Sequence, residues 1–225
     1  MYKNVIIIPY RQREEHLEYF IKHTVPLIEE CMPETKVVVI EQCEGKLFNR
    51  GKVLNVGFKE YMDKTEYFIT HDVDINPKKE TLDYYNIDIE NGVLKLLTPH
   101  NESFGQIVKF HNESINKSNG FPNNIWGWGI EDRALFYRCI IKNINIKNTS
   151  LRKINFIMLP HKSNRHTYSG EKAKKSKKWR GKNIDKLEEK DKLKMVTEDG
   201  INTVEYKIIE RKELHKIVEL IKVEI

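Results

Sequence analysis

The sequence predicts an α/β fold in which a mostly parallel, Rossmann-like central sheet is flanked by helices. Its first third alternates apolar, β-rich runs with segments whose apolar residues recur at helical spacing. The expected order is strand, helix, strand, helix, strand, over residues 4–9, 14–30, 36–40, 51–64 and 66–70. This alternation is typical of parallel strands with right-handed crossovers, whose ligands bind at the carboxyl ends of the strands. We therefore expect residues 9–13, 41–43 and 71–74 to meet in one cleft.

Each of these first elements has a local signature. The first strand contains the apolar run 5–8, which Pro9 ends. The first helix carries Leu17, Phe20, Ile21 and Ile28 on one face, and the second carries Val53, Leu54, Val56, Gly57, Phe58 and Tyr61. Runs rich in valine, isoleucine, tyrosine and phenylalanine then predict the second and third strands.

The remainder of the chain is less regular. We expect a strand at 93–97, a turn at 120–124, a helix at 132–142, an apolar run at 154–159 and strands at 204–209 and 217–223 that complete the sheet. Residues 162–190 lack apolar periodicity and are expected to form a mobile or solvated loop.

Length and charge limit the possible classes of protein. The 225 residues, 39% of them hydrophobic, are enough for one substantial core, so a single domain over 1–225 is expected. The net charge of +6 favours an anionic partner, which could be nucleic acid, a membrane surface or a phosphorylated small molecule. Nine of the 39 lysines and arginines lie within residues 162–182, so the basicity belongs mainly to one segment.

The cysteines and the amino-terminal sequence predict a cellular location. Cys31, Cys43 and Cys139 are odd in number and have no CxxC spacing, which argues against a disulfide framework or a zinc cluster. The apolar run 5–8 is too short for a signal peptide or a membrane span. These features lead us to expect a soluble, cytoplasmic protein without a transmembrane segment.

The sequence Asp72-Val73-Asp74 follows the third expected strand. Two carboxylates on a strand-to-loop edge suit a hard divalent cation, which prefers oxygen ligands and keeps positions open for phosphate. A solvated turn after a strand is the alternative interpretation of this pair.

The block Trp126-Gly127-Trp128-Gly129 precedes the adjacent acids Glu131 and Asp132. Indole rings can stack on the apolar face of a sugar, and a carboxylate at a helix start is a plausible general base for an acceptor hydroxyl. The alternative is an aromatic core turn followed by an acidic helix cap.

Two further groups of residues have chemistry that suits a metal or a diphosphate. Met158 and His161 end an apolar run, where they could ligate a transition metal and favour manganese over magnesium, although a lone histidine is more often structural. Arg11, Arg13 and Arg50 could bind diphosphate oxygens as forks, or could be ordinary surface charges.

Taken together, these segments resemble the β-1,4-galactosyltransferase family of inverting glycosyltransferases, which have the GT-A fold. The matching segments are residues 7–13, 48–58, 72–74, 119–124, 126–132 and 158–161, and residues 199–203 resemble the carboxyl end of the family's catalytic domain. The resemblance divides the domain into a nucleotide-binding half (1–75), an acceptor and metal half (76–161), a basic lid loop (162–190) and a sheet-completing end (191–225).

The resemblance also implies roles for individual residues. Asp74, Met158 and His161 would hold Mn²⁺. The UDP-sugar donor would be bound by Pro9, Arg11, Arg13, Phe48, Arg50, Asp72 and Trp128. Asp132, beside Glu131, would be the catalytic base, and the acceptor and sugar pocket would comprise Ser103, Phe104, Gly105, Trp126 and Arg133. The implied reaction transfers galactose or N-acetylgalactosamine to a saccharide or glycoconjugate hydroxyl and forms a β-linkage.

Three departures from the family pattern change these expectations. Arg133 stands where animal members have a third acid, so an anionic acceptor is favoured over N-acetylglucosamine. Ser103 stands in place of a bulky aromatic, which would admit N-acetylgalactosamine. The anchor and stem of Golgi members are not present in this sequence, which leads us to expect a bacterial or viral type.

Two other functions compete with sugar transfer. A non-catalytic protein that binds nucleotide sugars or carbohydrates would keep the pocket without turnover. A metal-dependent nucleic-acid-binding protein would use the Asp pair and the basic segment, but it gives no reason for the paired tryptophans, so no nucleic-acid partner is expected.

Overall fold

The computed structural model describes residues 1–127, 129–161 and 181–225. Within these ranges eight strands form one sheet, in the spatial order β7-β5-β6-β3-β1-β2-β10-β9, and two short strands, β4 and β8, form a second. The strands are β1 (Tyr2–Tyr10), β2 (Thr35–Gln42), β3 (Thr65–His71), β4 (Ile75–Pro77), β5 (Gly92–Leu97), β6 (Ile107–His111), β7 (Asn145–Asn148), β8 (Phe156–Met158), β9 (Lys207–His215) and β10 (Val218–Glu224). Trp128 and the expected lid residues 162–180 lie outside the described part of the chain.

The centre of the large sheet is parallel, as the sequence predicts. β1 pairs with β2 from Asn4↔Thr35 to Tyr10↔Glu41 and with β3 from Tyr2↔Thr65 to Ile7↔Thr70, both in parallel. β10 adds in parallel to the other side of β2, whereas β6 and β9 run antiparallel to β3 and β10. The carboxyl ends of β1 and β3 therefore reach the same edge of the sheet.

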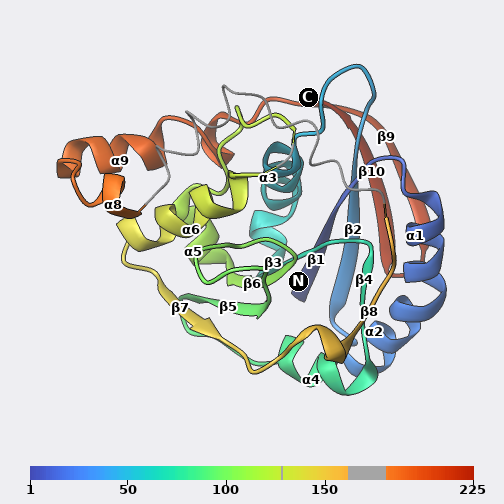
Figure 1. The fold of residues 1–225 in the computed structure, drawn as a ribbon. Coiled ribbons are helices and arrows are strands. Elements are labelled where there is room, and N and C mark those ends of the chain that lie inside the picture. The colour runs from blue at the N-terminus through green and yellow to red at the C-terminus, as the bar shows by residue number, and fades with distance from the viewer. Residues whose placement is uncertain (128, 162–180) are drawn as a thin grey trace.

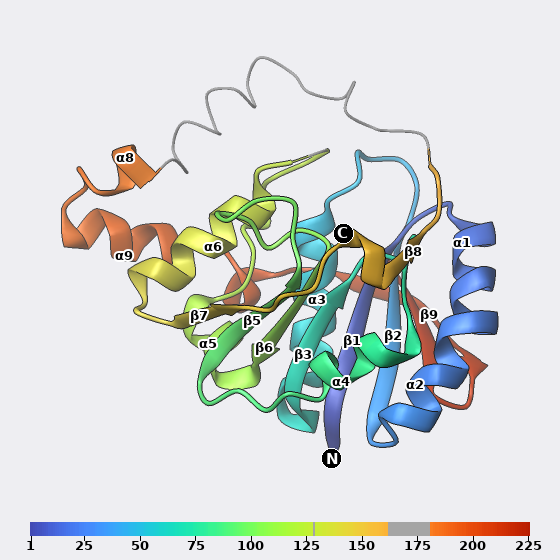
Figure 2. The same ribbon diagram turned by 60° about the horizontal axis from the view of Figure 1, so that its bottom comes forward.

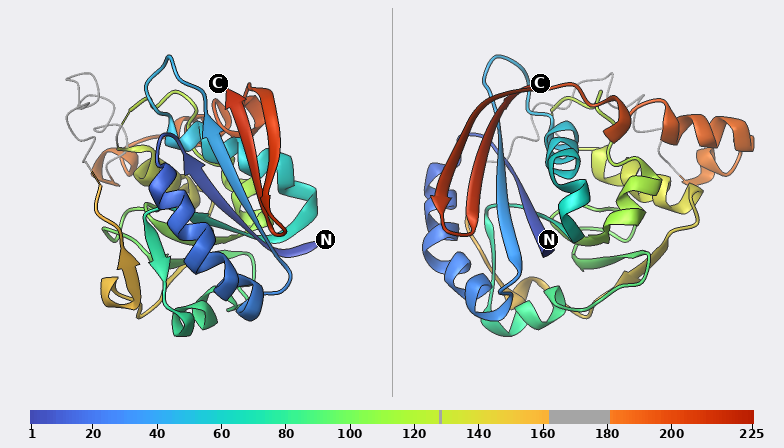
Figure 3. Two further views of the ribbon diagram at one scale, coloured as in Figure 1. Left: turned by 90° about the vertical axis from the view of Figure 1, so that its right-hand side faces the viewer. Right: turned by 180° about the vertical axis from the view of Figure 1, so that it is seen from behind.

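Helices cover both faces of this sheet (Figures 1 and 3). α1 (Glu14–Tyr19) and α2 (Val25–Cys31) lie on one face, and α3 (Arg50–Tyr61) lies on the other, with α5 (Asn112–Ser118) and α6 (Glu131–Ile141) beyond it. α4 (Leu82–Tyr85) lies below the strands near α2 in Figure 1, and α8 (Gly181–Ile184) and α9 (Glu189–Thr197) project beyond α6 (Figures 1 and 2).

Alternation along the central strands divides the core between the two faces. Val5 and Ile7 pack with the α3 side, whereas Ile6 and Ile8 pack with the α1 and α2 side, and all four are fully buried. Side chains alternate between the faces of a strand, and each buried Val or Ile contributes about 1.5–3 kcal/mol relative to exposure. A strand that is apolar on both faces is thus the sequence signature of this sheet.

The helix expected at 14–30 forms with one irregular turn. Between α1 and α2 lies a π-helical turn, Phe20–Thr24, which ends two residues before Pro26. Proline has no backbone N–H to donate to the preceding turn, and such wide turns accommodate that local mismatch. The element nevertheless covers the predicted segment and buries Leu17, Phe20 and Ile28.

The structure departs from the sequence expectation toward the carboxyl end. The strand expected at 204–209 begins only at Lys207 and continues to His215, because residues Ile201–Thr203 form a short 3-10 helix first. Within the segment expected as a loop, α8 and the first residues of α9 are helical. The apolar side chains of this region, Ile184 and Met195, pack in a small cluster with Ile130 and Tyr137, a long-range contact that local periodicity does not report.

The turn at 119–124 and the segment after α9 are joined by polar contacts. Arg138, which is 1% exposed, donates hydrogen bonds to the carbonyls of Gly120 (2.8 Å) and Asp199 (2.5 Å). Asn123 donates to the Gly200 carbonyl and accepts from the Asn55 side chain of α3. The motifs at 119–124 and 199–203 therefore have a structural role, because their contacts hold α3, the turn and the carboxyl-terminal segment together.

Candidate active site

A cleft of about 1600 Å³ opens at the carboxyl ends of β1 and β3. Most of the site residues that the sequence predicted line it: Pro9, Arg11, Arg13, Phe48, Arg50, Asp72, Asp74, Ser103, Gly105, Glu131, Asp132, Arg133, Met158 and His161. Residues that are far apart in the sequence, from Pro9 to His161, thus converge, as expected for a ligand site at the ends of parallel strands.

Three of the predicted site residues are not among these lining residues. Phe104 is fully buried and packs edge-on against Phe110 and Phe136, so it supports the cleft wall rather than lining the cleft. Trp126 packs against the α3-side core beneath Lys46 and is also outside the lining. Trp128 is outside the described residues, and its proposed role stays a prediction.

The expected contribution of residues 41–43 to the cleft is wrong. Glu41 forms an ion pair with Lys222 of the neighbouring strand β10. The Gln42 side chain is buried, where it donates to the Leu47 carbonyl and accepts from the Asn49 backbone N–H. The end of β2 therefore holds the loop that precedes α3 instead of facing the ligand space.

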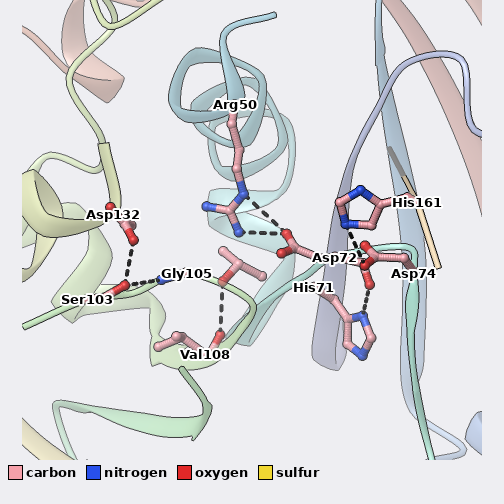
Figure 4. Close-up of polar contacts among 10 residues, drawn as sticks. Arg50, His71, Asp72, Asp74, Ser103, Gly105, Val108, Asp132 and His161 are labelled. Carbon is pink, nitrogen blue, oxygen red and sulfur yellow. Dashed lines mark hydrogen bonds and ion pairs between the residues drawn. The ribbon is translucent and has the colours of Figure 1, made fainter. Parts of the chain in front are cut away.

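Arg50 and Asp72 form a pair in the middle of the site (Figure 4). Arg50 Nε and Nη2 both donate to Asp72 Oδ1, at 3.2 and 2.9 Å. Arg50 is held at the start of α3 by its neighbour Asn49, whose side chain caps the helix by accepting from the Lys52 N–H at 2.9 Å. Among the described residues, Arg50 Nη1 is buried and has no hydrogen-bond partner.

The small sheet brings the segments that carry Asp74, Met158 and His161 together. Ile75 of β4 is opposite Met158 of β8, and Leu159 N donates to the Asp74 carbonyl at 2.8 Å. His161 Nε2 then lies 3.4 Å from Asp74 Oδ2 (Figure 4). Burial first, and then the negative charge of Asp72, raise the pKa of Asp74, while His161 opposes this shift.

This donor set fits a divalent transition metal. A carboxylate, an imidazole and a thioether suit an ion of intermediate softness such as Mn²⁺ better than an all-oxygen ion such as Mg²⁺. Within the described ranges no three His, Cys, Asp or Glu side chains form a metal group by themselves, because the third donor of this set is Met158. A cation here would also relieve the repulsion between the Asp72 and Asp74 carboxylates.

Across the cleft, Asp132 is held by two hydrogen-bond donors. Its Oδ1 accepts from the Arg133 backbone N–H at 2.8 Å, and its Oδ2 accepts from Ser103 Oγ at 2.5 Å. Ser103 Oγ itself accepts from the Gly105 N–H at 3.0 Å (Figure 4). A side chain at position 105 would lie 3.1 Å from Asp132 Oδ2, so glycine leaves the carboxylate room.

Glu131 occupies a different environment from its neighbour Asp132. It is 7% exposed, and burial, followed by the charge of Asp132, raises its pKa to about 7, against the lowering effect of Arg50. Its preceding residue, Ile130, has a φ of 87°, a left-handed conformation that strains a β-branched side chain. The strained turn places two adjacent carboxyl groups in separate surroundings, one in the cleft wall and one at its surface.

Arg11, Arg13 and Phe48 lie at the metal end of the cleft. Arg11 Nη1 donates to the Lys46 carbonyl at 2.7 Å, and its guanidinium lies 5.3 Å from the centre of the Phe48 ring. Arg13 Nη2 lies 3.3 Å from His161 Nδ1. Guanidinium groups beside a metal site are suited to diphosphate oxygens, and Phe48 offers an apolar surface next to them.

Sequence reasoning missed several residues that line the cleft. Thr98 and His100 come from the passage after β5, and Arg152 and Lys153 come from the segment before β8. The Arg-Lys pair directly before the apolar run 154–159 was a visible signal, because the metal residues at 158 and 161 follow that same run.

Comparison with known proteins identifies the family. The N-terminal region of glycosyl transferase group 7 matches residues 1–87, and the adjoining region described as the N-terminal domain of galactosyltransferase matches residues 88–162. Human β-1,4-galactosyltransferase 1 is 33% identical over 153 residues, which are 64% of this chain and 38% of that protein. Mouse β-1,4-galactosyltransferase 6 is 35% identical over 169 residues, which are 71% of this chain and 44% of that protein. The chain thus spans less than half the length of the curated relatives that it matches.

Solved structures confirm the GT-A fold. The catalytic domain of Drosophila β-1,4-galactosyltransferase 7, solved with xylobiose, matches with a TM-score of 0.78 at 22% identity, covering 100% of this chain and 94% of that one. The TarS structure from S. aureus, residues 1–349, matches with a TM-score of 0.53 at 16% identity, covering 87% of this chain and 70% of that one. The two structures support the fold, at identities too low to transfer function.

The comparisons correct one expectation and establish the family. The expectation of a cytoplasmic protein of bacterial or viral type is wrong, because relatives at 33–36% identity are human and mouse β-1,4-galactosyltransferases. In the described part of the chain, no helix has both the length and the apolar character needed to cross a bilayer. The two adjoining family matches over residues 1–162, together with the motifs gathered in the cleft, show that the chain belongs to the β-1,4-galactosyltransferase family.

Proposed function

We propose that this protein is an inverting, Mn²⁺-dependent glycosyltransferase that moves galactose from UDP-galactose to an acceptor hydroxyl. The observation that carries the proposal is the arrangement of the cleft, where Asp132 stands on one side and Asp74 and His161 stand on the other (Figure 4), with Met158 on the strand that pairs with Ile75, next to Asp74. A base on one side and a cation site on the other suit a displacement whose leaving group is a diphosphate. A family member from Drosophila was solved with manganese, UDP-Gal and xylobiose.

The metal end of the cleft would bind the nucleotide diphosphate. Asp74, Met158 and His161 would hold the ion, which when bound supplies positive charge to the diphosphate oxygens. Arg11 and Arg13 would add bidentate hydrogen bonds, and Phe48 would contact the uridine. Asp72 holds the guanidinium of Arg50 in place at the floor of this region.

The reaction would be a single displacement. Asp132 takes the proton of the acceptor hydroxyl while that oxygen forms a bond to the anomeric carbon of the donor. The bond between the anomeric carbon and the diphosphate oxygen breaks, and UDP leaves with its electron pair. Attack opposite to the leaving group inverts the anomeric centre, so an α-linked donor gives a β-linkage. Ser103 and the Arg133 N–H hold the carboxylate for this attack.

The test of the chemistry measures UDP release from UDP-galactose with Mn²⁺, with and without a panel of saccharide acceptors. Asp132→Asn is expected to lower turnover by at least about 100-fold, the lower range for loss of general base catalysis, while UDP-galactose still raises the melting temperature. Asp63→Asn, on the exposed surface, is the matched control. Unchanged turnover in Asp132→Asn would remove the base assignment, and donor binding without any turnover in the wild type would favour the non-catalytic alternative.

The metal assignment is tested by binding as well as by activity. We expect Mn²⁺ to bind the wild-type protein in calorimetry, and His161→Ala to weaken that binding by at least about tenfold, since one of three protein ligands is lost. His111→Ala, on the far side of the sheet from the cleft, is the control. Equal Mn²⁺ affinity in His161→Ala and the wild type would exclude this ligand set.

N-acetylgalactosamine is a second candidate for the transferred sugar. Neither Ser103 nor Gly105 places a bulky side chain beside Asp132, so the cleft wall has space for an acetamido group. Comparing UDP-galactose with UDP-N-acetylgalactosamine in the wild type and in Ser103→Tyr tests this. A preference for the acetamido donor that is lost in Ser103→Tyr would support it, and equal exclusion of that donor by both proteins would contradict it.

A further inference from the structure

The two ends of the cleft differ in how their positive charges are used. At the metal end, Arg13 contacts His161 and Arg50 is paired with Asp72. Around Asp132 the lining comes from the start of α6 and from Ser103 and Gly105, and residues 151–153, shortly before β8, also line the cleft. Figure 4 shows Asp132 and Ser103 on the opposite side of the Arg50–Asp72 pair from Asp74 and His161.

The cleft contains three cations that the donor assignments do not use. Arg133 follows Asp132 on α6, and Arg152 and Lys153 line the same cleft from the segment before β8. In the part of the chain that the structure describes, no carboxylate forms an ion pair with any of these three cations. Several positive charges in a concave site raise the local electrostatic potential and attract anionic ligands.

Arg133 directly follows the proposed base Asp132 in the sequence. Its backbone N–H donates to Asp132 Oδ1 at 2.8 Å, and its half-buried side chain lines the same cleft. An acceptor whose hydroxyl reaches Asp132 therefore presents its neighbouring substituents close to this guanidinium. A guanidinium binds a carboxylate or a phosphate through two parallel hydrogen bonds, and it offers no acceptor for a neutral sugar hydroxyl proton.

We propose that the acceptor is an anionic saccharide, bearing a carboxylate or phosphate close to the hydroxyl that is glycosylated. Arg133 binds that group, and Arg152 and Lys153 add longer-range electrostatic attraction from the segment before β8. This inference rests on the proposed glycosyl transfer and specifies its acceptor class. It also separates the two uses of positive charge in the cleft, with Arg11 and Arg13 on the donor diphosphate and Arg133 on the acceptor.

The experiment compares matched acceptors in the UDP-release assay with UDP-galactose and Mn²⁺. The panel contains neutral methyl glycosides, the corresponding methyl uronosides, and the corresponding sugar phosphates. The uronosides and the phosphates form separate arms, so the assay distinguishes carboxylate from phosphate. We expect at least one anionic arm to exceed its neutral counterpart by tenfold or more in kcat/KM, with the difference shrinking as ionic strength rises.

Arg133→Gln tests the residue itself. It should lower the ratio of kcat/KM for the anionic acceptor to kcat/KM for its neutral counterpart at least tenfold, because the substitution removes the guanidinium but keeps the backbone N–H that holds Asp132. Arg133→Lys should recover part of the preference, because the charge remains while the bidentate fork is lost. Lys142→Gln, which removes one positive charge at the opposite end of α6, is the matched control.

The outcomes are distinct from those of the proposed function. If UDP-galactose is hydrolysed but no anionic acceptor exceeds its neutral counterpart, the acceptor inference is wrong while glycosyl transfer stands. It is also wrong if anionic acceptors are preferred equally by wild type and Arg133→Gln. Loss of all UDP release in the wild type would instead contradict the proposed function itself.

Discussion

Ser103→Ala probes how the proposed base is held in place. In the structure Asp132 Oδ2 accepts from Ser103 Oγ at 2.5 Å, and the Gly105 N–H, which donates to the same hydroxyl, directs the serine proton toward the carboxylate. A hydrogen bond to a charged group contributes about 1.5–3 kcal/mol, and 1.4 kcal/mol corresponds to a tenfold change in rate. Part of that energy fixes the orientation of the carboxylate, so we expect kcat to fall about tenfold or more.

The assay is UDP release at saturating UDP-galactose, with kcat and KM determined separately. Ser103 does not contact the metal residues, so the KM for the donor should stay within twofold of wild type. Ser103→Thr keeps the hydroxyl and should recover most of the rate, whereas Ser150→Ala, outside the cleft lining, should leave it unchanged. A kcat for Ser103→Ala within twofold of wild type, in a protein with an unchanged melting temperature, would refute the positioning role.

Three further predictions concern stability, each measured by urea unfolding. The pKa of Glu131 in the folded protein, about 7, exceeds its ordinary value of 4.5, so the native state binds a proton more tightly and the stability of the wild type falls as pH rises between these values. Glu131→Gln has no such proton, and its unfolding free energy should therefore gain about 3 kcal/mol relative to wild type between pH 4.5 and 7.5. A difference between the two proteins that does not depend on pH would contradict this. Arg138→Met leaves the buried carbonyls of Gly120 and Asp199 without their donor and should lower the unfolding free energy by about 3 kcal/mol, whereas a loss below about 1 kcal/mol would show that these contacts are dispensable. Gly57→Ala would place a Cβ 2.6 Å from Ile7 Cγ2. It should lower the unfolding free energy by about 1–3 kcal/mol although alanine has the better helix propensity. An increase in stability would show that the structure relaxes around this contact.

Local sequence patterns were sufficient for the first three strands and the helices between them. The apolar runs that form β1, β2 and β3 are buried on both faces, and such runs are distinct over a few residues. The antiparallel strand β6 was missed, because Ile107–His111 pairs with β3 and β5 across long stretches of chain. Register and pairing of this kind depend on partners that a short sequence window does not contain.

For the candidate site, too, the sequence predicts the residue types, and the contacts between distant segments are known only from the structure. Motif order and residue chemistry predict Asp74, Met158, His161 and Asp132 as site residues, since carboxylate, thioether and imidazole groups have chemical preferences of their own. Only the structure shows that the pairing of β4 with β8 brings the segments of Asp74, Met158 and His161 together, and that Ser103 holds Asp132.

The sequence by itself thus determined the fold class, the family and the chemistry available to this protein, because side-chain type and local periodicity are properties of short segments. The tertiary structure decided which groups meet and how their charges are balanced. Glu131 and Asp132 are adjacent acids in the chain, yet burial raises the pKa of Glu131 to about 7, while two hydrogen-bond donors hold Asp132 at the cleft. That difference arises from solvent exclusion and from contacts between distant segments, which only the folded chain creates.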